Sequence, residues 1–86
     1  MEHNIKKPMT KNATWERRIE VLRDATSGDA SRGYAFLTAS MCYLEAADSN
    51  DYERTELFRR LRKAIAKGSK KQIVAILDDL DSLNHE

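Results

Sequence analysis

Apolar side chains recur every three or four positions along most of this sequence, and that spacing constrains the fold more than any other feature. Near the N-terminus it runs through Trp15, Ile19 and Leu22. Such spacing places side chains on one face of an α-helix, whereas a half-buried β-strand requires strict alternation. With only 3 Gly and 1 Pro, the chain also lacks the turn residues of an all-β fold. The sequence therefore predicts an all-α protein.

Four segments carry the helical pattern, and short polar turns separate them. The first begins near Asn12 or Thr14 and ends at residues 26–29; the others span about 30–47, 52–67 and 69–83. Gly68 is placed to end the third segment, and the fourth starts at the capping residue Ser69.

The length of the chain limits how these segments are organised. A sequence of 86 residues has room for one domain. Residues 1–11 show no apolar periodicity and contain three lysines, which is typical of a mobile tail. We therefore expect a compact bundle of about four helices over residues 12–86, preceded by that tail.

The segment over residues 30–47 differs from the others because apolar side chains surround most of its circumference. Glu45 is its only acid. A helix that is apolar all round is buried on several sides. We therefore expect this helix at the centre of the bundle, covered by the other three.

The sequence offers little of the chemistry that an enzyme needs. The two histidines, His3 and His85, lie at opposite ends of the chain, and Cys42 lies in an apolar run far from both. This separation gives neither a metal-ligand spacing nor a Cys–His pair. A cysteine in such a run is expected to be a small buried hydrophobe. We expect a non-enzymatic protein without cofactor or metal.

No segment of the sequence indicates export or insertion into a membrane. The longest charge-free run covers residues 33–44, which is shorter than the roughly 20 residues of a membrane-spanning helix. Residues 1–11 lack the apolar core of a secretory signal. We expect a cytoplasmic protein with no membrane partner.

A cluster of cations is the first surface feature that points to a partner. It occupies residues 59–71, a stretch without any acid, and its members are Arg59, Arg60, Arg62, Lys63, Lys67, Lys70 and Lys71. The net charge is only +1, so any attraction of a polyanion depends on this local cluster. Three interpretations stay open: an ordinary solvated face, contact with an acidic protein, and contact with nucleic acid.

The junction at Gly68 also fits part of the helix-turn-helix pattern. Ala64 precedes the glycine by four residues, and Val74 and Leu77 follow it by six and nine. The motif has a small residue and two buried apolar residues at these positions.

In this interpretation the recognition helix begins with Lys70, Lys71 and Gln72. Two features oppose it: Ser69 replaces the apolar residue that usually follows the glycine, and three aspartates further along the helix would repel a DNA backbone. They are Asp78, Asp79 and Asp81.

An apolar stripe along the last segment is the second surface feature. Its members are Ile73, Ile76, Leu77, Leu80 and Leu83. In a domain this small a second copy or another protein often completes the core. The stripe is therefore a candidate dimer or partner surface.

These features favour a small regulatory or adaptor protein that acts by protein–protein interaction through the basic helix and the apolar stripe of the last helix. The partner presents an acidic or an apolar surface, and a homodimer is one such assembly. The alternative is a small DNA-binding transcriptional regulator that uses the helix-turn-helix-like element around Gly68.

Overall fold

The computed structural model describes residues 11–28 and 32–85 and confirms the all-α prediction. This part of the chain contains four helices and no strand: α1 (Lys11–Thr26), α2 (Arg32–Asp48), α3 (Tyr52–Lys67) and α4 (Lys70–Asn84). The expected tail over residues 1–11 lies outside the described residues, except that Lys11 already belongs to α1.

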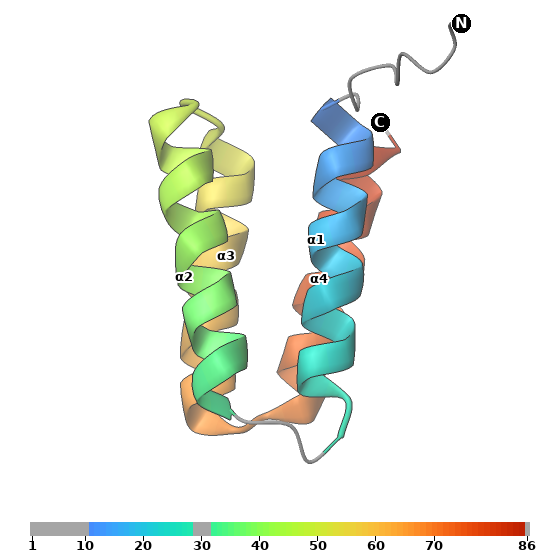
Figure 1. The fold of residues 1–86 in the computed structure, drawn as a ribbon, viewed down its shortest axis with the longest axis vertical. Helices are drawn as coiled ribbons and strands as arrows, with labels where there is room; N and C mark the ends of the chain where they lie inside the picture. Colours follow the sequence, from blue (N-terminus) through green and yellow to red (C-terminus); the bar gives the residue numbers. More distant parts are fainter. Residues whose placement is uncertain (1–10, 29–31, 86) are drawn as a thin grey trace, which may run out of the picture.

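The four helices form a ring in which each packs against two neighbours (Figure 1). The neighbouring pairs are α1 with α2, α2 with α3, α3 with α4, and α4 with α1. Successive helices run in opposite directions, so α1 begins at the same end of the bundle where α4 finishes. No helix occupies the centre of this ring, and the expectation of a central helix over residues 30–47 is therefore wrong.

The inward face of α2 consists of small side chains. Its buried residues are Ala35, Ala39, Cys42 and Ala46. Small residues at a helix interface allow the two backbones to approach closely. The large apolar side chains of α2 are partly buried against α3 or point into solvent, which is why its apolar circumference did not make it central.

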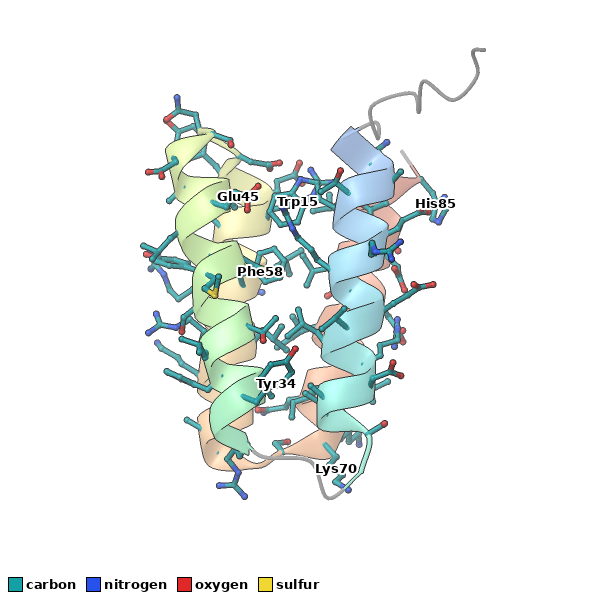
Figure 2. All side chains as sticks on the ribbon, viewed as in Figure 1. Trp15, Tyr34, Glu45, Phe58, Lys70 and His85 are labelled. Carbon is teal, nitrogen blue, oxygen red and sulfur yellow. The ribbon has the colours of Figure 1, made fainter. Side chains whose placement is uncertain are left out.

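Long side chains from the other three helices fill most of the core. The largest fully buried ones are Phe58, Ile19, Leu22, Leu61, Ile65, Leu77 and Leu80. The rings of Trp15 and Phe58 lie 5.5 Å apart between their centroids, and Figure 2 shows both side chains in the space between the helix pairs. Each such side chain contributes about 1.5–3 kcal/mol when it is fully buried.

The turn between α3 and α4 is fixed by local hydrogen bonds, as the sequence predicted. Gly68 adopts a left-handed conformation with φ of 77°, and its N–H donates to the Ala64 carbonyl over 2.9 Å. The N–H of Ser69 donates to the same carbonyl over 3.1 Å. The Ser69 hydroxyl in turn accepts from the N–H of Gln72 over 3.4 Å. This arrangement ends one helix and begins the next within two residues.

A buried arginine joins the helices at the opposite end of the bundle. Arg54 is 6% exposed, and its guanidinium donates to the Asp51 carboxylate and to Asn84 Oδ1, each over 2.6 Å. The same guanidinium lies 5.3 Å from the centre of the Trp15 ring. Side chains of α1, α3 and α4, with the capping residue Asp51, therefore meet at this end.

Candidate functional site

The face of the bundle formed by α3 and α4 carries an open furrow. Towards the Gly68 end, this furrow has a volume of about 740 Å³. Its lining combines small or apolar residues with cations and one amide: Ala64, Ala66, Ala75, Ile76, Arg60, Lys63, Lys67 and Gln72. We call this hollow the basic end of the α3–α4 furrow.

Helical spacing explains why cations line the basic end. Arg60, Lys63 and Lys67 lie at i, i+3 and i+7 of α3, so they share one side of that helix. The apolar contribution from α4 comes from Ala75 and Ile76, and Ile76 packs half-buried against the core. A ligand in this hollow therefore meets an apolar surface and positive charge together.

The cations of the basic end differ in how far they are engaged. Arg60 Nε donates to the Glu56 carboxylate over 3.3 Å, and Arg59 lies 3.7 Å from the same carboxylate. These pairs are exposed, and such pairs contribute little to stability. Within residues 11–28 and 32–85, no ion pair is recorded for Lys63 or Lys67. These two ammonium groups are the best placed to receive an acidic ligand.

The furrow continues past Arg60 into a hollow of opposite character. This second hollow has a volume of about 490 Å³. It is lined by Tyr52, Glu53, Glu56, Leu57, Arg60, Asp79, Ser82 and Leu83. Three of these residues are acids, so the furrow is positive towards Gly68 and negative towards its other end.

The structure divides the cation cluster that the sequence predicted as one binding surface. Arg60, Lys63 and Lys67 line the basic end, whereas Arg59 and Arg62 line a hollow on the side of α3 that faces Phe36 of α2, and Lys63 borders both hollows. The cation cluster is therefore spread over several surfaces, because residues 59–71 cover more than one side of α3 and also the start of α4.

The prediction that Arg62 belongs to the partner-binding surface is not supported by its contacts. Its Nε donates to the Ser40 hydroxyl over 2.9 Å. Its guanidinium lies 5.0 Å from the ring centre of Phe36 and 5.3 Å from that of Tyr43. Stacking on aromatic rings is a stabilising use of arginine. Arg62 therefore holds α3 to α2, and we remove it from the candidate site.

The geometry around Gly68 does not match a helix-turn-helix. That motif sets its two helices at about 90–120°, whereas α3 and α4 run antiparallel side by side (Figure 1). Val74 is 51% exposed, although the motif needs it buried. Lys70 and Lys71 are exposed at the start of α4 and lie outside the basic end of the furrow.

The apolar stripe predicted on the last helix is mostly used inside the domain. Ile73, Leu77 and Leu80 are buried in the core, while Ile76 and Leu83 line the two ends of the furrow. Ile73, Leu77 and Leu80 therefore cannot form a free dimer surface, because they are packed in the core of the domain. The sequence did not show that the exposed apolar surface lies on α2 instead.

Several other titratable side chains are buried or form contacts within the domain. Cys42 is buried, as predicted, and burial raises the pKa of its thiol to about 11. Asp78 and Asp81 both accept hydrogen bonds from Arg23 of α1, over 2.8 and 2.6 Å, and these bonds raise the pKa of Arg23. His85 Nε2 lies 3.4 Å from the Glu16 carboxylate.

The described residues lack two features, a metal-binding cluster and a helix that could span a membrane. No group of three or more His, Cys, Asp or Glu side chains there is arranged to hold a metal ion. Among its helices, none has the length and apolar character needed to cross a bilayer.

Comparisons with known proteins add no relative. No family model, no curated protein and no solved structure matches the chain.

Proposed function

We propose that this chain is a non-enzymatic interaction module whose α3–α4 furrow binds an acidic, amphipathic segment of another protein. One observation carries the proposal: the basic end offers a hollow of about 740 Å³ in which Lys63 and Lys67 stand beside the apolar side chain of Ile76. A helix with one apolar and one acidic face fits such a surface, in the manner of other helix-in-groove complexes.

The polarity of the furrow favours a protein ligand over a nucleic acid. A polyanion is attracted by Lys63 and Lys67 but repelled by Glu53 and Asp79 further along the same furrow. The apolar part of the lining also offers neither charge nor hydrogen bonds to a phosphate backbone. A protein segment can change charge along its length, so the ligand we propose is acidic over the basic end and basic over the acidic end.

The absence of enzymatic activity is part of the same proposal. The Cys42 thiol is buried and has a raised pKa, which disfavours its action as a nucleophile. The hydroxyl of Ser40 is occupied, since it donates to the Phe36 carbonyl and accepts from Arg62. Small regulators and adaptors of this type act by binding alone.

The proposal is tested with a labelled amphipathic peptide of about 11 residues, long enough to occupy the basic end alone, that carries leucine on one face and glutamate on the other. Fluorescence anisotropy measures its affinity for the full chain. The variant Lys63→Glu/Lys67→Glu should bind about 10–100-fold more weakly, because it replaces attraction by repulsion at the furrow.

The matched control is Lys70→Glu/Lys71→Glu, which changes the net charge equally but lies outside the basic end. It should bind the peptide as the wild type does, apart from a small general electrostatic effect. Equal weakening by both variants would show a non-specific charge effect and overturn the proposal. If the wild type binds duplex DNA at low salt and the Lys70→Glu/Lys71→Glu variant does not, the DNA-binding alternative is favoured instead.

A further inference from the structure

The outward face of α2 carries four large apolar side chains that remain mostly in solvent. Tyr34, Leu37, Met41 and Leu44 are 54%, 59%, 62% and 60% exposed. We call them the α2 stripe. Figure 2 shows Tyr34 projecting from α2 on the side next to α1. The buried face of α2 consists of small side chains, while these four large apolar side chains lie on its outward face. The helix therefore carries more apolar surface than the core of this domain buries.

The α2 stripe is large enough to take part in an interface. With about 200 Å² for each fully exposed side chain of this size, the stripe presents roughly 450 Å². That value is comparable to the largest apolar patch of a typical monomer, about 300–600 Å², and such patches are often functional. Two copies of the stripe with their flanks bury about 1,000 Å², which is the lower limit for a specific interface.

The spacing of the stripe is that of a coiled-coil seam. Its members follow one another at intervals of three, four and three residues, the alternation of a and d positions in a heptad. They are also placed symmetrically about Ala39. Leu37 and Met41 lie two residues from it, and Tyr34 and Leu44 lie five. The stripe is therefore complementary to itself when two α2 helices run antiparallel.

Charge around the stripe selects both the partner and its direction. Residues 33–44 contain no charge, so the stripe offers nothing to an ionic ligand. Glu45 borders it and is paired with Arg18 of α1 over 2.8 Å. In a parallel pair the two copies of Glu45 would face each other, whereas an antiparallel pair sets each against Gly33.

We propose that the occupant of this surface is a second copy of the chain, with the two α2 helices antiparallel across a two-fold axis. Leu37 then packs against Met41 of the other copy, and Tyr34 packs against Leu44 of the other copy. No residue of α2 lines the α3–α4 furrow, so this dimer is independent of the proposed peptide binding.

Sedimentation equilibrium tests this proposal by measuring the mass of the full chain in solution. The protein concentration is varied from about 5 to 500 µM, because an interface of this size is expected to associate in that range. The wild type should approach twice its chain mass of 9.9 kDa. The variant Leu37→Lys/Met41→Lys should associate at least about 100-fold more weakly, because four ammonium groups then meet in an apolar seam.

The control substitution Val74→Lys changes an apolar residue on α4 that is also about half exposed, and it should leave the dimer intact. A wild type that stays monomeric throughout overturns the proposal, and so does a dimer that survives Leu37→Lys/Met41→Lys. The stripe variant should still bind the acidic peptide, so the two proposals fail separately.

A cross-linking experiment tests the direction without adding charge. On a Cys42→Ala background, one protein carries Leu37→Cys and a second carries Met41→Cys. Mild oxidation of their mixture should produce mainly the mixed disulfide dimer, while each protein alone cross-links poorly. Efficient cross-linking of each protein alone, with no preference for the mixed product, means a parallel pair and overturns the antiparallel assignment.

Discussion

At the scale of single residues, Cys42 shows how burial changes the chemistry of a side chain. The thiol is 4% exposed, and loss of solvation raises its pKa to about 11, although the nearby Arg18 acts in the opposite direction. The apolar run around this residue was sufficient to predict its burial. It was not sufficient to predict which charged side chain lies near it, because Arg18 comes from another helix.

The raised pKa of Cys42 predicts a loss of stability in alkali. The folded state favours the protonated thiol, so this contribution is complete below the usual pKa of 9.0 and is lost as the pH rises towards 11. The expected decrease in the free energy of unfolding is about 2–3 kcal/mol. Urea titrations at several pH values measure it, and Cys42→Ala should lack this decrease. An identical pH dependence in that variant would refute the explanation.

The structural role of Arg54, a buried residue, was not predicted from the pattern of charges in the sequence. It lies among acids and arginines in the sequence, yet it precedes Phe58 by four residues and Leu61 by seven. That spacing places it on the apolar face of α3, and this was the available signal. Its partner Asn84 could not be inferred, since Asn84 reaches Arg54 only through the antiparallel packing of α4.

Replacement of Arg54 should therefore be costly. Arg54→Ala removes a buried ion pair with the Asp51 carboxylate together with the hydrogen bond to Asn84, and breaking such a pair costs about 3–5 kcal/mol. Chemical denaturation followed by circular dichroism measures the change. The control Arg59→Ala, which removes an exposed side chain of the same helix, should alter stability by less than about 0.5 kcal/mol. Similar effects for the two arginines would contradict the structural role given to Arg54.

At the scale of elements, α2 shows where inference from the sequence reached its limit. Its apolar circumference correctly predicted a helix, and its boundaries were close to those observed. Its position was wrong, because the size of the side chains decides which face packs. Alanines at residues 35, 39 and 46 face the core and let α2 approach its neighbours, while larger side chains remain outside.

This account of α2 predicts a strong dependence on side-chain volume. Ala39→Leu inserts three carbons at a fully buried position and should destabilise the domain by about 1–3 kcal/mol. The same substitution at Ala47, which is exposed on α2, should have an effect below about 0.5 kcal/mol. Thermal and urea unfolding of both variants provide the comparison. Toleration of leucine at residue 39 would mean that the inward face is not closely packed.

At the scale of the whole molecule, the fold was more predictable than the candidate site. Periodicity, capping residues and short turns identify helices because they depend on neighbours in the sequence. The furrow depends on how α3 and α4 pair. Only that pairing places Ile76 beside Lys63 and Lys67, and it directs Arg62 away towards α2. The local concentration of cations is therefore visible in the sequence, but their distribution over different sides of α3 is not.

In the whole molecule, the proposed binding surface is the basic end of the α3–α4 furrow. The most direct test is amide chemical-shift mapping by NMR as the acidic amphipathic peptide is added to the full chain. The largest changes should fall on Lys63, Lys67, Gln72 and Ile76, which line that hollow. Changes concentrated on the outward face of α2, or spread over all exposed lysines alike, would contradict the claim.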